Sequence, residues 1–386
     1  MAKYFLKYTG NEVEELLTKS KASFVPGDYK LTRTQEQDGK WLKCDGSMYD
    51  KTDYPSLSDL SVAGVYSESP SVYKFGEYYT RGFGRVFTYY PTIEDCINGI
   101  NGKTVTVTTD STKYTSMSYA AYSEINGGLY AIGGSAGVLW TATSIDGPYA
   151  AHSMSTSIYD DDDVDSICGT KYGIYARIWD DSADKEYAVR ITSHTGSLTT
   201  ITSGSIDDLF ATEDREYAVI PLYQSATTYV CHGTTSTTVS LPITGTIVDR
   251  TYSIKDGVWY AITYSGSSGS RNNYVLQCKK DILGNNVDGG GYTTLYSSGT
   301  VSDRWSGTYL LGYANEYTFL VDSYFTKTIR IIKDGQFVAS CPLLSLSFKK
   351  YFTDNNKVYC GGYRIDFNKF NTPKLTSTDG TYYILS

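Results

Sequence analysis

The stretch Val138-Leu139-Trp140-Thr141-Ala142-Thr143-Ser144-Ile145-Asp146-Gly147 is a strand-like run that closes on a Ser-x-Asp-Gly turn, and Pro373-Lys374-Leu375-Thr376-Ser377-Thr378-Asp379-Gly380 repeats the pattern. Asp-Gly is a hairpin-turn dipeptide, because Gly accepts positive φ and Asp bonds its own backbone nearby. Weaker copies lie at residues 109–111, 193–196, 233–236, 288–289 and 333–336. An interval of roughly 45 residues is typical of a repeat fold.

A second marker stands upstream of most of these turns. It is a tyrosine-bearing apolar run that follows a Gly or polar turn, and its copies lie at residues 128–132, 172–176, 216–220, 258–262, 316–320 and 357–360. We interpret these runs as one strand position in successive units.

Units of this length with three or four short strands and no helix between copies predict an all-β protein, a β-propeller. Seven blades, or alternatively six, fill residues 66–386. Stacking buries both faces of each sheet, and tyrosine suits the space between blades because its hydroxyl still reaches water or a carbonyl. A pair of β-sandwiches lacks this period, and the coils of a β-helix are shorter.

Composition agrees with a sheet-rich chain. The 386 residues include 38 tyrosines and 36 glycines but only 9 prolines and 4 methionines. The net charge of −8 and the isoelectric point near 5.0 argue against non-specific nucleic-acid binding, because no excess of cations exists to neutralise phosphates. We therefore expect no nucleic-acid partner.

The sequence contains no apolar run long enough to span a membrane and no secretory signal, so we expect no membrane insertion and folding in a cytosol. The seven cysteines are scattered without a CxxC or Cys/His cluster. We interpret them as small buried hydrophobic residues, with zinc or redox roles as the alternatives.

Residues 1–65 differ from the repeats and form a predicted N-terminal module. Asn11 followed by Glu14, with Val13, Leu16 and Leu17 on one face, predicts a short helix at residues 11–19. So short a helix needs a partner surface, either its own module or an identical helix in a homo-oligomer.

Residues 39–60 of this module carry a Trp-Leu-x-Cys-Asp-Gly-Ser run followed by Thr-x-Tyr-x-x-Leu. The segment resembles the phage tail collar motif, at Trp41, Leu42, Cys44, Asp45, Gly46, Ser47, Thr52, Tyr54, Leu57 and Leu60. The resemblance implies a virion tail component that is made in the host cytoplasm and has other phage tail proteins as partners. After Leu60, members of that family usually continue with a hydrophobic helix and a Gly-rich stretch. Residues 61–66 replace both here and lead directly into the first expected blade.

From the residues alone, this segment is a scaffold. We expect Trp41 and Leu42 to enter a small core, Asp45-Gly46 to make a tight turn, and Tyr54, Leu57 and Leu60 to close over the core. A nucleophilic or acid/base role is disfavoured, because Cys44 has no nearby histidine and Asp45 no partner carboxylate.

The turn residues Ser144, Asp146, Gly147, Ser377, Asp379 and Gly380 resemble the Asp-box of sialidase-type propellers. In that family the box caps a hairpin between outer strands and lies away from the active site. An enzyme of that class would also carry an arginine triad and a Tyr-Glu nucleophile pair. The sequence assembles neither, and residues 363–366 are only the nearest approach to the arginine motif.

No catalytic, cofactor-binding or metal-binding residues are assigned. The acidic run Asp160, Asp161, Asp162, Asp163 and Asp165 is read as a solvated loop, with a hard-cation site as the alternative. The three histidines lack metal-ligand spacing, and no P-loop or Rossmann pattern is present.

Two functions follow. The first is a non-enzymatic phage tail protein that is anchored by residues 1–65 and presents a propeller face to a virion protein or to a host-surface glycan or protein receptor. The alternative is a carbohydrate-active propeller hydrolase, which would need convergent carboxylates or arginines.

Overall fold

The structure is a computed structural model. It describes residues 29–32, 41–58, 61, 63–67, 70–107, 119–134, 139–152, 163–180, 183–267, 269–301, 308–314, 316–322, 328–342, 351–360, 362–375, 377 and 381–385. The expected helix at residues 11–19 and the motif residue Leu60 lie outside them. The chain divides into a small unit, made of Met1–Tyr66, Asp354–Val358 and Arg364–Ser386, and a large unit, made of Ser67–Thr353 and Tyr359–Tyr363.

Six four-stranded antiparallel sheets lie in the described part of the large unit, each built from four consecutive strands. Sheet 1 holds β5 (Tyr73–Phe75), β6 (Tyr78–Thr80), β7 (Val86–Tyr90) and β8 (Lys103–Thr106), with helix α2 (Ile93–Asn98) before β8. Sheet 2 holds β9 (Tyr119–Ser123), β10 (Leu129–Gly133), β11 (Leu139–Ala142) and β12 (Ala150–His152), with the 3-10 turn η2 (Ile125–Gly127). Sheet 3 holds β13 (Asp163–Thr170), β14 (Gly173–Asp180), β15 (Lys185–Ile191) and β16 (Thr199–Ser203).

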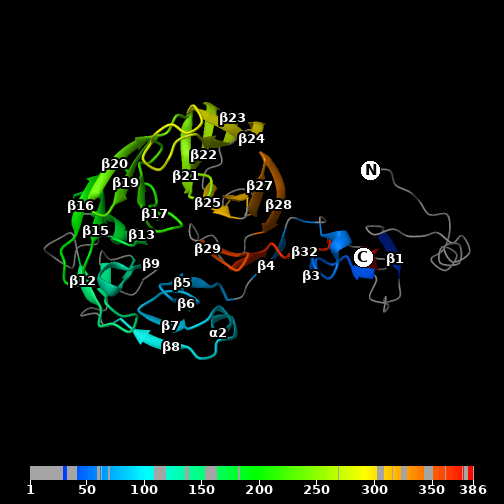
Figure 1. Cartoon of the computed structure of the whole chain (residues 1–386), viewed down its shortest axis with the longest axis horizontal. Coiled ribbons are helices and arrows are strands. Elements are labelled where there is room, and N and C mark those ends of the chain that lie inside the picture. The colour runs from blue at the N-terminus through cyan, green and yellow to red at the C-terminus, as the bar shows by residue number, and fades with distance from the viewer. Residues whose placement is uncertain are drawn as a thin grey trace, which may run out of the picture. The chain divides into compact units, whose positions relative to one another are not determined.

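Sheet 4 holds β17 (Phe210–Ala211), β18 (Ala218–Pro221), β19 (Thr227–His232) and β20 (Thr235–Ser240). Sheet 5 holds β21 (Thr246–Ser253), β22 (Val258–Ser267), β23 (Ser270–Cys278) and β24 (Tyr292–Val301). Sheet 6 holds β25 (Thr308–Ala314), β26 (Tyr317–Asp322), β27 (Thr328–Lys333) and β28 (Gln336–Pro342). These sheets follow one another around a common centre, with the first strand of each sheet innermost (Figure 1).

A seventh four-stranded sheet has strands from distant parts of the sequence. Sheet 7 has the order β29 (Tyr351–Asp354), β30 (Lys357–Cys360), β31 (Tyr363–Asp366) and β4 (Gly64–Ser67). Its fourth strand therefore precedes sheet 1 in the chain. Phe352 of β29 packs against Tyr79 of β6, with ring centroids 5.9 Å apart, so sheet 7 also contacts sheet 1.

Hydrophobic layers between successive sheets form the core. Second strands such as β10 and β18 are buried along their whole length, whereas fourth strands such as β20 are mostly exposed. In the layer between sheets 2 and 3, for example, Leu129 and Leu139 cluster with Ile167 and Ile174. Similar clusters join sheets 1 and 2, 3 and 4, 4 and 5, and 5 and 6. Burial on both faces requires such stacking.

The small unit contains residues from both ends of the sequence. A three-stranded sheet has the order β1 (Tyr29–Thr32), β33 (Thr381–Leu385), β2 (Trp41–Lys43). A two-stranded sheet pairs β3 (Met48–Asp50) with β32 (Lys369–Asn371), and the 3-10 turn η1 spans Pro55–Leu57.

The β-propeller prediction is confirmed, and the tyrosine-bearing runs are the second strands β10, β14, β18, β22, β26 and β30 of sheets 2 to 7. The number of blades in the ring, seven or six, stays a prediction. The structure differs at the C-terminal end: residues 364–386, expected in the propeller, group with the small unit. The reason is that β4 already supplies the fourth strand of sheet 7, so the chain after β31 continues into β32 and β33.

We predict that Gly169→Ala lowers the free energy of unfolding by about 2 kcal/mol or more, as overpacking does. A Cβ at Gly169 would lie 1.9 Å from the carbonyl oxygen of Tyr122 on the neighbouring inner strand, where backbone cannot yield. Urea unfolding measures the loss. Gly82→Ala is the matched control, because its Cβ would meet nothing within 4 Å. Equal stability of the two variants would contradict the close approach of β9 and β13.

Candidate functional site

The apolar residues of the collar-like motif form the core of the small unit. Leu42, Cys44 and Leu57 are buried and cluster with Phe370 and Ile384, which come from the other end of the sequence. Burial, with a smaller contribution from the neighbouring Asp45 charge, raises the pKa of the Cys44 thiol to about 11. Cys44 is therefore a neutral packing residue at neutral pH.

The polar motif residues make the predicted tight turn. Asp45 Oδ1 accepts a hydrogen bond from the backbone N–H of Ser47 at 2.9 Å, and Gly46 between them adopts a φ of +88°. Thr52 is exposed. This geometry is that of an Asx-type turn in a scaffold.

The aromatic motif residues divide between core and surface. Tyr54 packs edge-on against Phe370, with ring centroids 6.4 Å apart. Trp41 is only partly buried, and the Lys30 ammonium lies 4.1 Å above its ring. Trp41 thus covers the outer face of the sheet instead of filling the core as expected.

The Asp-box-like turn at residues 144–147 lies between the third and fourth strands of sheet 2. Asp146 accepts hydrogen bonds from Tyr89 at 3.0 Å and from Lys103 at 2.6 Å, both in sheet 1. Ser144 Oγ accepts from the Asp146 N–H at 3.3 Å, and Gly147 adopts a φ of +85°. The turn therefore links two sheets at their outer rim.

The second copy of that turn lies in a different setting. Ser377 falls between β32 and β33, whose partners are strands of the small unit, while Asp379 and Gly380 lie outside the described residues. This copy therefore does not join strands of a four-stranded sheet.

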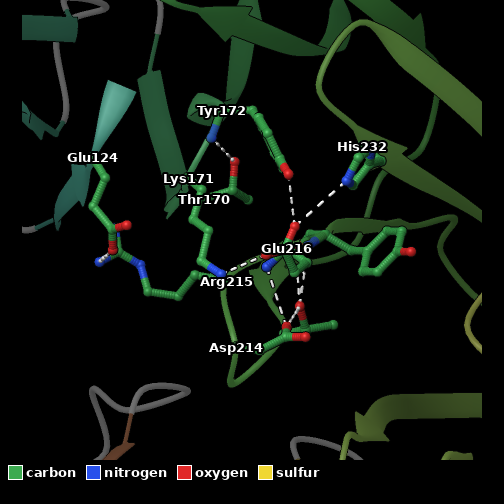
Figure 2. Close-up of polar contacts among 10 residues, drawn as sticks. Glu124, Thr170, Lys171, Tyr172, Asp214, Arg215, Glu216 and His232 are labelled. Atoms are coloured by element: carbon green, nitrogen blue, oxygen red, sulfur yellow. Dashed lines mark hydrogen bonds and ion pairs between the residues drawn. The ribbon is translucent and has the colours of Figure 1, made fainter. Parts of the chain in front are cut away.

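Two neighbouring sheets bring together a group of side chains that the sequence analysis missed. We call Lys171, Tyr172, Glu216, Tyr217 and His232 the turn-face cluster. The first two lie in the turn between β13 and β14 of sheet 3. In sheet 4, Glu216 and Tyr217 lie in the turn between β17 and β18, and His232 is the last residue of β19. Figure 2 shows Lys171, Tyr172 and His232 around Glu216. One signal in the sequence marks the group, because Lys171-Tyr172 and Glu216-Tyr217 occupy equivalent positions of the repeat.

The Glu216 carboxylate is the centre of the turn-face cluster. It accepts hydrogen bonds from Lys171 Nζ and from the Tyr172 hydroxyl, the latter at 2.8 Å, and lies 3.4 Å from His232 Nε2 (Figure 2). The hydrogen bond from Lys171, followed by that from Tyr172, holds the pKa of Glu216 below its usual range. The carboxylate is thus ionised and satisfied at neutral pH.

Two tyrosine rings pack against the His232 ring beside this carboxylate. The His232 ring centroid lies 4.5 Å from that of Tyr172 and 5.1 Å from that of Tyr217. His232 keeps 45% of its side chain exposed and is open to solvent.

Arg215 ties three inner turns together in the same region. Its guanidinium donates to the backbone carbonyls of Tyr122 and Gly169. It also pairs with Glu124 at 3.0 Å (Figure 2). Arg215 also adopts a φ of +60°, an uncommon value for a residue with a side chain. The turns of sheets 2, 3 and 4 are therefore held in fixed positions.

A tyrosine and a glutamate from distant sheets also meet. The Tyr351 hydroxyl of β29 donates to Glu213 Oε1 of the β17–β18 turn at 2.7 Å. Burial by surrounding protein atoms raises the pKa of Glu213, although water reaches the side chain, and the charges of Asp214 and Asp256 add to this. The pair could not be predicted from a sequence pattern, because the two residues are far apart in the sequence.

The acidic run contributes one described ion pair. Asp160, Asp161 and Asp162 lie outside the described residues. Asp163 and Asp165 belong to strand β13 and not to the expected solvated loop, and Asp165 Oδ2 lies 3.0 Å from Arg177 Nη2. No group of three metal-ligating side chains occurs within the described ranges. No helix in that part of the chain is long and apolar enough to cross a membrane. The six cysteines whose side chains are described are buried, and no disulfide joins them.

Two histidines meet although the sequence separates them. Thr141 Oγ1 lies 2.7 Å from His152 Nε2, and the Thr141 carbonyl lies 2.8 Å from His194 Nδ1. Burial lowers the pKa of His152 below its ordinary value. The neutral His152 imidazole thus contacts Thr141 within sheet 2, and His194 of the β15–β16 turn links sheet 3 to the same threonine.

No protein-family model matches the sequence, and no curated protein is detectably similar to it. Solved propellers show similar folds. The Dos1 propeller is 10% identical, with a TM-score of 0.47 over 83% of this chain and 78% of that one. The Cps50 (Swd1) β-propeller domain of Myceliophteria thermophila is 8% identical, with a TM-score of 0.46 over 83% and 97%. YCF48 bound to D1 peptide is 8% identical, with a TM-score of 0.43 over 92% and 100%. At TM-scores below 0.5 these likenesses carry no argument about function.

We predict that His152 makes stability depend on pH. Its folded pKa lies below the ordinary value of about 6.5, so the unfolded chain takes up a proton first as the pH falls. The contribution of His152 is fully present above that ordinary value and is lost as the pH falls through the folded pKa. Urea unfolding at pH 7.5 and 5.5 should show a larger loss for the natural chain than for His152→Gln. Parallel losses would contradict this role.

Proposed function

We propose that the protein is a non-enzymatic bacteriophage tail protein. Its small unit attaches to the virion tail, and its propeller presents a binding face to a neighbouring virion protein or to a host-surface receptor. The observation that supports this best is that the collar-like residues Leu42, Cys44 and Leu57 build a compact unit distinct from the propeller.

The surface of the small unit is suited to attachment. In the described sheet, β1 pairs with β33 alone and is an edge strand. Its apolar side chains Tyr29 and Leu31 are exposed. They lie on the face that carries their cross-strand partners Ile384 and Tyr382, which belong to the small-unit core. An edge strand with exposed apolar side chains is a typical site for pairing with another protein.

The propeller contributes a rigid face. The turns of sheets 2, 3 and 4 are tied by Arg215, and the turn-face cluster is satisfied internally by Glu216. Rigid turns carrying aromatic side chains bind partners at a low entropic cost.

We predict that the natural chain is present in purified phage particles and that Leu31→Lys lowers its incorporation at least about tenfold. A lysine on an edge strand blocks pairing with another chain. Leu31 is 43% exposed, so a lysine at this position can extend its ammonium into water. Quantitative mass spectrometry of purified particles from phage that carry the edited gene measures the amount of this chain in each particle.

Leu283→Lys is the matched control, because Leu283 is 45% exposed and lies in the large unit. Absence of the natural chain from particles would refute the tail assignment. Equal incorporation of both variants would refute attachment through β1.

Glycan hydrolysis is the second candidate function, and the Tyr351–Glu213 hydrogen bond favours it, because sialidase-type enzymes use a Tyr-Glu pair. The charges around this pair argue against hydrolysis of an acidic glycan. Burial and, after it, the carboxylates of Asp214 and Asp256 raise the pKa of Glu213. These two carboxylates would also repel a substrate carboxylate, which sialidase-type enzymes bind with arginines.

We therefore expect no release of reducing sugar when the purified protein is incubated with bacterial surface polysaccharides, and the same blank result for Glu213→Gln. Release by the natural chain, together with a loss of at least about a hundredfold in Glu213→Gln, would establish the hydrolase and overturn the non-enzymatic assignment.

A further inference from the structure

We propose that the turn-face cluster binds an uncharged, hydroxyl-rich sugar unit of a host-surface polysaccharide. This inference rests on the proposed host-facing role of the propeller and names the site and the ligand class for it. The rings of Tyr172, His232 and Tyr217 would hold the sugar, and the polar groups beside them would read its hydroxyls.

The group of three rings provides the contact surface. The His232 ring packs against Tyr172 and Tyr217 at centroid distances of 4.5 Å and 5.1 Å and interplanar angles of 60° and 43°, and 45% of the His232 side chain is exposed. The electron-rich face of an aromatic ring attracts the C–H groups on the apolar face of a pyranose, as it attracts other positive edges. Neighbouring rings at different angles offer this contact at more than one point of a sugar unit.

Polar groups at the edge of the rings supply hydrogen bonds. The Lys171 ammonium has three N–H donors and the Glu216 carboxylate about four acceptor positions, so both can take a further partner beyond their mutual contact. Their side chains are 40% and 27% exposed. An ammonium donates and a carboxylate accepts, so together they serve the hydroxyl groups of a sugar, each of which does both. A few polar groups beside an apolar surface are typical of small-ligand sites.

The charge balance favours an uncharged sugar. The Lys171 and Glu216 charges form one ion pair, and Arg215 and Glu124 form a second one nearby. No unpaired cation of the cluster is therefore available for a carboxylate or phosphate. An acidic polysaccharide would also meet a chain with a net charge of −8.

The site is preorganised. The carbonyl of Gly233, next to His232, accepts hydrogen bonds from the Tyr175 hydroxyl at 3.2 Å and from Arg190, both in sheet 3. Thr235 Oγ1 donates to the His232 carbonyl at 2.8 Å. The turn that carries the central ring is thus fixed before a ligand arrives, which lowers the entropic cost of binding.

The test uses the full chain and an array of neutral and acidic bacterial oligosaccharides, followed by titration calorimetry on the best neutral ligand. We expect His232→Ala to weaken binding at least about tenfold and His232→Phe to restore it to within about threefold, because phenylalanine keeps the ring. Tyr223→Ala is the matched control. Tyr223 is 55% exposed, and its turn joins β18 to β19 at the opposite end of sheet 4.

Binding that is unchanged in His232→Ala, or that is lost equally in His232→Phe, would overturn the proposal. So would a blank array, or binding only to acidic oligosaccharides. On whole host cells, periodate should abolish binding of the chain and proteinase should not. The reverse pattern would identify a protein receptor and refute the sugar site. If the chain is nevertheless found in phage particles, the tail function stands and this inference alone falls.

Discussion

The rest of the structure depends on the burial of both faces of each sheet. Second strands such as β10 and β18 have no polar face to turn toward water, so a sheet that contains one is stable only between two others. Charged side chains accordingly lie in the turns at the ends and the rim of the sheets, as in the Lys171–Glu216 and Arg215–Glu124 pairs. Exceptions occur within the sheets, where Arg177 of β14 pairs with Asp165 of β13 and Arg250 of β21 is buried.

The same stacking determines which turn residues meet. Equivalent positions of adjacent sheets lie next to each other, so a lysine in one repeat and a glutamate at the same position in the next form a contact, as Lys171 and Glu216 do. Asp146 also contacts the preceding sheet, because it accepts hydrogen bonds from Tyr89 and Lys103 at the rim. The turn-face cluster is thus a product of the repeat and not of a local motif.

The sequence predicted the fold well where the signal was periodic. The tyrosine-bearing runs are second strands because an apolar alternation of fixed spacing reports a fixed structural position. The repeat pattern assigned Ser377 to the propeller, but this residue lies between β32 and β33 of the small unit. A Ser-x-Asp-Gly sequence alone does not show which sheet its flanking strands join. Nor could the repeat pattern predict the Tyr351–Glu213 pair, since contacts between distant sheets leave no period in the chain.

The mixed origin of sheet 7 has a consequence for how the protein is made. Residues 64–67 of β4 leave the ribosome before sheets 1 to 6 are made, whereas their partner strand β31, residues 363–366, is translated after those sheets. β4 must therefore wait with an unpaired edge while they are made, and the pairing that completes sheet 7 has a high contact order. A nascent chain of this design has a strong need for chaperone protection until β31 has emerged.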